Sequence, residues 1–246
     1  AEGRRLREYF NAPAGRVLCD ADYSQIELRV LASMSGDANM INAFGSGTDI
    51  HTVTASQVFG LPQDMITPEL RSRAKAVNFG IVYGIGAFSL SKDIGVTRAE
   101  ADRYIKSYLA AYPDVAAYME KAIDDAKKNG YVTTLYGRRG YIPELSNSNG
   151  NMRAFGERVA RNAPIQGTAA DIMKLAMARV EQRLQAEGLA AKLIMQVHDE
   201  LIAECPAEEQ AQVKRILTEE MEHAAALSVP LTVDAHCGKN WLTAKG

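Results

Sequence analysis

The sequence predicts an α+β fold, in which an antiparallel sheet with covering helices is interrupted by an inserted, mainly helical block. Strand-like runs of apolar and β-branched residues lie near both ends of the 246-residue chain, and helical spacing dominates between them. An acidic motif follows a strand-like run in each half, around Asp22 and around Asp199. We therefore expect strands from both halves of the sequence to share one sheet that carries both motifs.

The first strand is expected at residues 16–22, after a basic approach that contains Arg4, Arg5 and Arg7. From Ser24 to Met34 the apolar residues recur with helical spacing, which predicts that a helix follows the strand directly. The first acidic motif thus lies at the junction between a strand and a helix.

The middle of the chain, from residue 49 to about 161, is predicted to be mainly helical. Thr67-Pro68 starts one helix with a cap followed by proline, and Thr97 to Glu100 forms a capping box that starts another. Asn129-Gly130 ends a third helix. Alternating β-branched and aromatic residues predict a hairpin at 131–143.

The last third of the chain returns to strands. A helix from about Asn149 to Asn162 is expected to be interrupted at Pro164 and to resume as far as Glu187. The remaining expected elements are hairpin strands at 192–197 and 201–205, a helix at 206–227 and a strand at 231–237. No internal repeat or low-complexity stretch occurs.

The amino-acid composition limits which class of protein this chain can belong to. The chain is 47% hydrophobic and 24% charged, which allows one large domain or two smaller ones with a substantial core. No apolar run approaches the ~20 residues of a membrane span, and no signal-peptide pattern is present. The cysteines are odd in number and lack metal-ligand spacing, so we expect no disulfide framework and a reducing, cytoplasmic location. They are Cys19, Cys205 and Cys237.

Charge is unevenly distributed although the net charge is only −2. Residues 137–161 are net basic, and residues 199–222 are net acidic. A basic surface beside an acidic metal site suits a polyanionic partner such as nucleic acid. Solvated helix faces are the alternative for either stretch.

The two acidic motifs predict a divalent metal site. Asp22 and Asp199 are the expected ligands, with Glu200 beside them and the Tyr23 carbonyl as a possible further ligand. Mg²⁺ needs only one or two carboxylates plus substrate phosphates, and it can clamp the oxygens of a phosphoryl transfer. The alternative is that each aspartate is an ordinary turn or cap residue.

A second constellation has a residue of interest every fourth position along one predicted helix. Its members are Arg71, Lys75, Phe79 and Tyr83. Such positions share a helix face, so two cations that suit phosphates precede two rings that suit a flat base. An amphipathic helix with snorkelling cations is the alternative. Three glycines lie within or just after this helix: Gly80, Gly84 and Gly86. Glycines in a helical pattern suggest that another group approaches the backbone closely or that the chain has a hinge there.

Other polar residues carry weaker signals. His51, at a helix start, could reach phosphate or could be a local cap or core histidine. His198 lies in the acidic turn but could point away from Asp199. Asn162 and Gln166 flank Pro164 and could contact bases or sugars, or they could satisfy backbone groups at a kink.

Three motifs, in this order, resemble those of family A DNA polymerases of the bacterial DNA polymerase I type. They are Asp22-Tyr23-Ser24-Gln25-Ile26-Glu27-Leu28-Arg29, Arg71-x3-Lys75-x3-Phe79-Gly80-x2-Tyr83-Gly84, and Gln196-Val197-His198-Asp199-Glu200. The likeness runs from about Gly3 to the end of the chain. It implies a palm formed by residues 1–48 and 162–246, with fingers inserted at 49–161. It also implies that the thumb lies upstream, so extension by this piece alone is expected to be weak or undetectable.

The resemblance also implies roles for individual residues in template-directed DNA synthesis. Asp22 and Asp199, with the Tyr23 carbonyl, would hold two Mg²⁺ ions, and Glu200 and Lys75 would join them in catalysis. The expected nucleotide-binding residues are Arg71, Lys75 and His51 at the triphosphate, Phe79 at the sugar and base, Glu27 against a ribose 2′ hydroxyl, and Gln25. The expected DNA-binding residues are Tyr83 at the template base, Arg158, Asn162, Gln166 and His198. The implied partners are primer-template DNA and dNTP, bound by a monomer.

Two other classes compete with the polymerase. A two-metal nuclease would share the carboxylates but has no use for the helix with cations and rings. A non-catalytic nucleic-acid-binding module has no use for carboxylates, which repel phosphate unless metal intervenes.

Overall fold

The structure is a computed structural model that describes residues 5–246. Arg4 of the expected basic approach and the first positions of the expected palm lie outside these residues. The chain divides into two compact units. The first contains the described residues up to Ile26 together with 169–226 and 230–246, and the second contains 27–168 and 227–229. Helices and antiparallel strands occur together, which confirms the α+β prediction.

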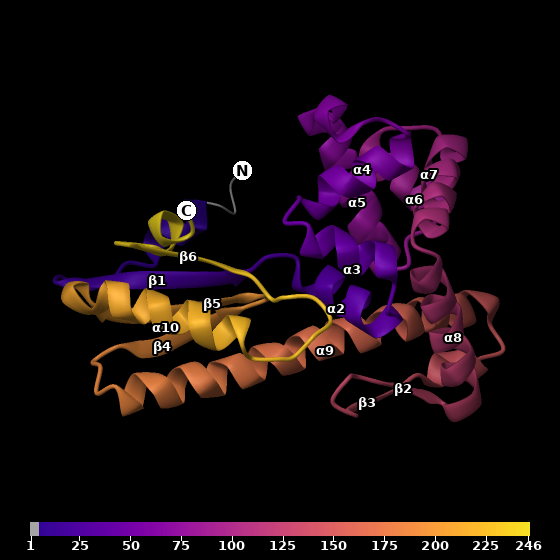
Figure 1. Ribbon diagram of the computed structural model, residues 1–246. Helices are drawn as coiled ribbons and strands as arrows, with labels where there is room; N and C mark the ends of the chain where they lie inside the picture. Colours follow the sequence, from indigo (N-terminus) through magenta and orange to yellow (C-terminus); the bar gives the residue numbers. More distant parts are fainter. Residues whose placement is uncertain (1–4) are drawn as a thin grey trace. The chain divides into compact units, whose positions relative to one another are not determined.

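The first unit is built on a four-stranded antiparallel sheet with the strand order β4-β5-β1-β6 (Figure 1). The strands are β1 (Arg16–Tyr23), β4 (Lys192–Val197), β5 (Glu200–Pro206) and β6 (Val233–Gly238). Strand β1 pairs with β5 on one side and with β6 on the other, and Asp22 lies opposite Glu200 and Asp234. Strands from both sequence halves therefore share one sheet, as predicted.

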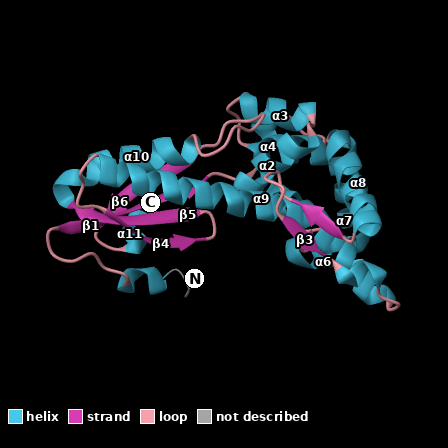
Figure 2. Ribbon diagram, turned by 90° about the horizontal axis from the view of Figure 1, so that it is seen from below, coloured by secondary structure: helices cyan, strands magenta, loops and turns pink. Residues whose placement is uncertain are grey.

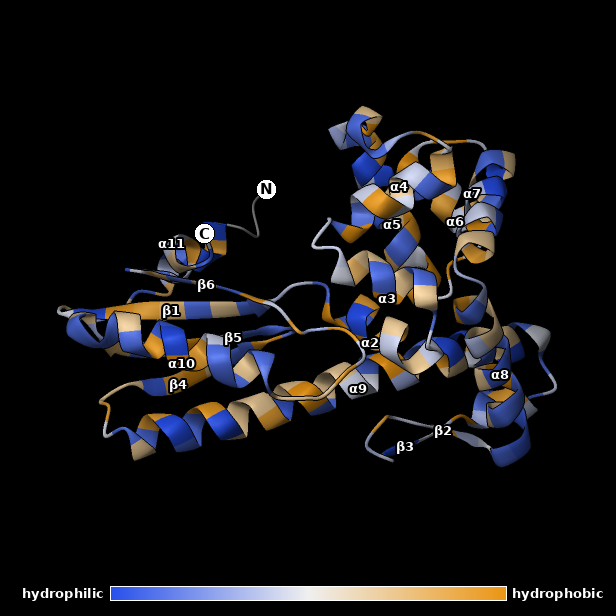
Figure 3. Ribbon diagram, viewed as in Figure 1, coloured by the Kyte–Doolittle hydropathy of each residue, from blue (hydrophilic) through white to orange (hydrophobic). Residues whose placement is uncertain are grey.

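Helix α10 (Gln210–Glu222) lies across this sheet and contacts β1, β5 and β6 (Figure 2). It is shorter than predicted, because a 3-10 turn, η4 (Ala207–Glu209), precedes it and the helix ends before residue 227. Figure 3 shows hydrophobic and hydrophilic bands alternating along α10. The apolar residues, spaced by three or four positions, are buried, and they are Val213, Ile216, Leu217 and Met221.

Strand alternation gives β1 two different faces. Cys19, Ala21 and Tyr23 are buried, and the Tyr23 hydroxyl donates to the carbonyl of Met221 in α10 at 2.7 Å. The intervening residues point to the opposite face. There Leu18 packs with a short helix, α11 (Trp241–Ala244), in a small core cluster. The two aspartates of β1 share that second face.

The second unit is mainly helical. Its helices are α2 (Ile26–Ser35), α3 (Ala38–Gly45), α4 (Ile50–Phe59), α5 (Pro68–Val82), α6 (Ala87–Ile94), α7 (Arg98–Ala111) and α8 (Pro113–Asn129). It also contains a two-stranded hairpin of β2 (Tyr131–Thr133) and β3 (Arg139–Tyr141), as predicted. Short 3-10 turns complete the described elements of the chain: η1 (Leu6–Tyr9) in the first unit, and η2 (Gln63–Met65) and η3 (Pro143–Ser146) in the second.

The predicted helix boundaries in this unit are confirmed. Thr67 caps α5 by accepting a hydrogen bond from the amide of Leu70. Thr97 and Glu100 form both hydrogen bonds of the capping box at α7. Gly130 ends α8 in the left-handed region with φ 79°, which glycine adopts without steric cost.

The predicted interruption at Pro164 is wrong. One helix, α9 (Gly150–Ala186), runs through the proline and contributes to both units. Proline removes one backbone donor, but the helix continues on either side, and the Thr168 hydroxyl donates to the Pro164 carbonyl at 2.7 Å. The flanking turns therefore outweigh the local loss of one hydrogen bond.

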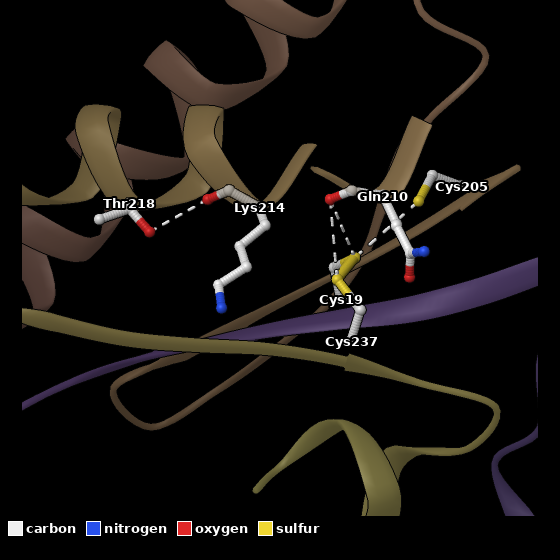
Figure 4. The surroundings of a disulfide bond; sticks show 6 residues. All are labelled: Cys19, Cys205, Gln210, Lys214, Thr218 and Cys237. Atoms are coloured by element: carbon white, nitrogen blue, oxygen red, sulfur yellow. Dashed lines mark hydrogen bonds between the residues drawn. A yellow bond between two sulfur atoms is a disulfide. The ribbon is translucent and has the colours of Figure 1, made fainter. Parts of the chain in front are cut away.

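The cysteine prediction also needs correction, because Cys19 and Cys237 form a disulfide (Figure 4). They lie directly opposite each other on β1 and β6 although 218 positions separate them in the sequence. This register is a property of the sheet, so cysteine spacing could not reveal it. Cys205 is a free, buried thiol with its Sγ 3.9 Å from Cys19 Sγ. Among the described helices, none is both long and apolar enough to cross a membrane.

Candidate active site

The acidic motifs meet at one end of the sheet in the first unit. Asp22 is next to the last residue of β1 and lies opposite Glu200, the first residue of β5. Asp199 occupies the turn between β4 and β5, and its carbonyl accepts the amide of Tyr23 at 3.0 Å. The structure thus brings together the expected metal ligands, with Glu200 beside them.

Two residues beside these acids adopt an uncommon backbone conformation. Gln25 and His198 have φ values of 51° and 52°, and they are the only described residues other than glycine with positive φ. Non-glycine residues enter this region at some steric cost, and such residues concentrate at functional sites. His198 is exposed at its turn. His198 directly precedes Asp199, and Gln25 directly precedes the first residue of α2.

Burial and mutual repulsion shape the electrostatics of the cluster. Burial raises the pKa of Asp199, and the nearby Asp22 carboxylate raises it further. Within the described residues, Asp22 Oδ1 and Glu200 Oε1 are buried oxygens without a hydrogen-bond donor. No three carboxylate, imidazole or thiolate groups of the described chain form a complete ligand set. Carboxylate oxygens without a hydrogen-bond donor suit Mg²⁺, because this ion prefers oxygen ligands and fills its remaining coordination positions with water and phosphate.

A lysine that the sequence did not single out lies in this cluster. Lys245 Nζ donates to Asp22 Oδ2 at 2.8 Å and also to Glu200 Oε2. Nothing in its sequence neighbourhood marks it, because its partners are 223 and 45 positions away. The cluster therefore contains a built-in cation.

Asp20 is a further acidic residue that sequence patterning missed. It is buried, and its Oδ2 accepts the indole N–H of Trp241 at 3.0 Å. Burial raises the pKa of Asp20 to about 6, although Lys245 and the Trp241 hydrogen bond oppose that shift. This contact joins α11 to the strand that carries Asp22.

In the second unit, the predicted stripe of cations and rings lies on α5. Arg71 makes two hydrogen bonds with Asp49, Nε to Oδ2 and Nη2 to Oδ1, each at 2.8 Å. Burial alone would raise the pKa of Asp49, but hydrogen bonds from Arg71 and Thr52 outweigh it and lower the pKa. Asp49 also caps α4, so one carboxylate fixes both a helix start and the arginine.

The aromatic end of the stripe is ordered by ring contacts. Phe79 and Tyr83 are stacked, with centroids 6.4 Å apart and an interplanar angle of 18°. Lys75 Nζ lies 5.8 Å from the Phe79 centroid, and Tyr83 is 44% exposed. The cation and both rings thus share one side of the helix, which is the arrangement that the spacing predicted.

A cavity of about 910 Å³ adjoins these rings within the second unit. Phe79 and Tyr83 line it together with Arg158 and Arg161 from α9. Gly84, in the turn after α5, has φ 66°, which glycine adopts without steric cost, and it lies beside Arg158. A concave site with flat rings and two guanidinium groups suits a nucleobase near phosphates.

The remaining predicted residues occupy several places. Asn162 and Gln166 follow Arg158 at four-residue intervals on α9 and are half-buried. Glu27 lies in the first turn of α2 and is also half-buried. Their positions are compatible with the predicted roles, which stay predictions.

His51 is buried in α4, 1% exposed, rather than presented on a surface. The amide of Asn78 lies 3.0 Å from its Nδ1, and Asn78 Oδ1 accepts the hydroxyl of Thr54. We therefore assign the ring proton to Nε2. Burial lowers the pKa of His51 to about 4, and nearby Arg71 and Lys75 add to this against the opposing effect of Asp49. At neutral pH the His51 ring is therefore uncharged, and its contact with phosphate stays a prediction.

This histidine should make the chain sensitive to acid. The unfolded chain gains a proton near pH 6.5, whereas the folded chain resists it to about pH 4, so the free energy of unfolding falls as pH drops between these values. The loss attributable to His51 is roughly 3 kcal/mol. Urea denaturation of His51→Gln from pH 4 to 7 should show a smaller loss. His223→Gln replaces an exposed histidine and should leave the slope unchanged.

Comparison with known proteins gives consistent matches along the chain. The family model described as DNA polymerase family A matches residues 1–243. DNA polymerase I of Bacillus subtilis is 52% identical over 246 residues, and the match covers 99% of this chain and 28% of the relative. DNA polymerase I of Caldicellulosiruptor bescii is 50% identical over 244 residues, covering 99% of this chain and 29% of the relative.

A solved structure described as the POL domain of Pol1 from M. smegmatis, in complex with DNA primer-template and dNTP, has a similar fold. Its TM-score is 0.94 at 42% identity, and the match covers 99% of this chain and 43% of that one. This chain thus spans less than a third of the length of the two sequence relatives above. The family model covers nearly every residue. The chain belongs to DNA polymerase family A.

Proposed function

We propose that this chain carries the nucleotidyl-transfer centre of a DNA-directed DNA polymerase. The observation that supports it most is that one family A chain contains both an acidic cluster on an antiparallel sheet and a cation-aromatic stripe on α5. The first suits hard cations and the second suits a nucleoside triphosphate. Neither the acidic cluster nor the stripe on α5 would by itself distinguish a polymerase from a nuclease or a binding module.

In this proposal Asp22 and Asp199, with the Tyr23 carbonyl, hold two Mg²⁺ ions. Bound Mg²⁺ neutralises charge on the attacking and leaving oxygens of an in-line phosphoryl transfer. Glu200, almost fully buried beside Asp22, adds negative charge that favours a cation there. The two aspartates thus position the metal, and the protein supplies a fixed pair of acids rather than a nucleophile.

The residues of α5 bind and orient the incoming dNTP. Arg71 and Lys75 contact its phosphates, and Lys75 also supports catalysis by countering charge on the leaving group. Phe79 packs against the sugar and base, and Tyr83 occupies the template base position. His51 contributes a hydrogen bond from Nε2. Glu27 excludes a ribose 2′ hydroxyl, and Gln25 is a further nucleotide-binding residue.

The partners in this proposal are primer-template DNA and dNTP. Arg158, Asn162, Gln166 and His198 contact the DNA near the primer terminus. Residues 1–48 and 162–246 form the palm, and 49–161 form the fingers. We place the protein in DNA replication or repair, as a cytoplasmic monomer, where reducing conditions would open the Cys19–Cys237 disulfide. Extension by the 246-residue chain alone is expected to be weak, because it matches only 28% of the Bacillus subtilis relative.

Primer extension tests the proposal. We expect residues 1–246, placed in the matching region of the full-length Bacillus subtilis relative, to add the templated nucleotide when Mg²⁺ and dNTP are supplied. Robust processive synthesis by the 246-residue chain alone would contradict the expected weak activity. Cleavage of DNA without dNTP would favour the two-metal nuclease, and DNA binding that ignores Mg²⁺ would favour the binding module.

Phe79→Ala should weaken dNTP binding by about 5-fold to 150-fold, since stacking on a base is worth about 1 to 3 kcal/mol. Phe88→Ala is the matched control, because Phe88 is also a ring approached by a lysine, at 4.5 Å from Lys92 Nζ, but lies 58% exposed on α6. Fluorescence titration with a labelled dNTP measures both. Equal effects of the two substitutions would contradict a specific platform at Phe79.

A further inference from the structure

A lysine from the C-terminal segment of the first unit lies in the acidic cluster. Lys245 follows directly after α11, and its ammonium group bridges Asp22 Oδ2 and Glu200 Oε2. The lysine side chain is 25% exposed and that of Glu200 is 4% exposed. The ion pair is therefore poorly screened by solvent, unlike pairs on an open surface.

The position of this lysine is fixed by the fold. Trp241 is buried and donates its indole N–H to Asp20 on β1. Asn240 and Thr243 form a capping box at the start of α11. Gly238 lies so close to this turn that an added Cβ would come within 2.4 Å of Thr243 Oγ1. Several independent contacts thus hold the segment that carries Lys245 against the strand that carries Asp22.

Lys245 contacts the same carboxylate of Asp22 that is the proposed metal ligand. One oxygen each of Asp22 and Glu200 is paired with the ammonium group, and the other is buried without a donor among the described residues. An ammonium group and a divalent ion repel each other at such short range. A metal bound through Asp22 Oδ2 must therefore displace the lysine.

We propose that Lys245 is an internal counter-ion that pairs with Asp22 and Glu200 and competes with divalent metal at Asp22. It keeps the acids close together when metal is absent, and it raises the metal concentration needed to fill the site. When metal binds, the ammonium group leaves Asp22. This role makes Lys245 a positioning residue, and it rests on the proposed assignment of Asp22 and Asp199 as metal ligands.

Direct Mn²⁺ binding tests the inference without relying on activity. Free Mn²⁺ is measured by electron paramagnetic resonance during titration of the 246-residue chain, with neither DNA nor nucleotide present. Lys245→Gln and Lys245→Met should each bind Mn²⁺ about tenfold more tightly, which corresponds to about 1.4 kcal/mol. Lys239→Gln removes an equal charge from an exposed lysine six positions away and should change affinity less than about twofold.

The outcomes separate this inference from the proposed function. Unchanged or weaker Mn²⁺ binding in the Lys245 variants, with circular dichroism showing them folded, overturns the competition. The use of two uncharged replacements keeps the result independent of one variant's folding. Asp199→Asn should weaken Mn²⁺ binding. If it does not, the metal site itself is misassigned, whereas a loss with Asp199→Asn and no gain with Lys245→Gln refutes the counter-ion alone.

Discussion

Replacing Asp199 with Asn is expected to lower the rate of single-nucleotide incorporation by about 10³-fold or more, equivalent to about 4 kcal/mol on the activation barrier. The amide keeps the shape of the side chain but removes the charge that attracts Mg²⁺. Asp199 lies in the tight turn before β5, and its carbonyl accepts the Tyr23 amide, so its backbone position should persist in the variant. The loss should therefore report the charge rather than a change of fold.

Rapid-quench incorporation with residues 1–246 in the full-length Bacillus subtilis relative measures this effect. Asp234→Asn is the matched control, because Asp234 lies opposite Asp22 in the β1–β6 register but has a side chain 78% exposed. It should leave the rate within about twofold. Retained synthesis by Asp199→Asn would refute the assignment of this carboxylate as a metal ligand.

Replacing Trp241 with Ala is expected to destabilise the chain by about 3 to 5 kcal/mol. The substitution empties space in the cluster that Trp241 forms with Leu18 and Ile202, and it removes the edge-to-face contact with the Phe10 ring, whose centroid lies 5.4 Å away. It also removes the hydrogen bond that the buried Asp20 carboxyl accepts. Lost packing and an unsatisfied polar group thus act in the same direction.

Urea denaturation followed by far-ultraviolet circular dichroism measures this loss, because Trp241 is the only tryptophan and its fluorescence disappears with it. Trp241→Phe keeps an aromatic ring and should cost about 1 to 3 kcal/mol, mainly from the lost hydrogen bond. Equal stability of Trp241→Ala and the unsubstituted chain would show that α11 is not anchored by this residue. The position of Lys245 would then depend on the capping box at Asn240 and the close approach at Gly238.

Much of the fold followed from local sequence signals, because these depend on neighbours in the chain. The caps at Thr67 and Thr97 and the glycine stop at Gly130 are of this kind, and the structure contains all three. Pro164 misled the prediction, because a proline signal is local whereas α9 continues through 37 residues. The sequence could not show how far the adjoining turns would outweigh one lost hydrogen bond.

In the candidate site too, the parts that depend on local spacing were predicted, and the parts that depend on distant segments were not. The spacing of Phe79 and Tyr83 predicted a shared helix face, and their rings are stacked on α5. Lys245 and the Cys19–Cys237 pair were not predicted, since each depends on a register between distant segments. A lone lysine near Trp241 carries no pattern. Only the sheet shows that it reaches Asp22.

The location of bound metal tests the central claim most directly. Crystals of the chain grown with Mn²⁺ and a dNTP, measured at the manganese absorption edge, would give anomalous peaks at each ion. We predict peaks within about 2 to 2.5 Å of carboxylate oxygens of both Asp22 and Asp199, with Lys245 Nζ no longer on Asp22. Manganese bound elsewhere, with the Lys245–Asp22 ion pair intact, would contradict the account.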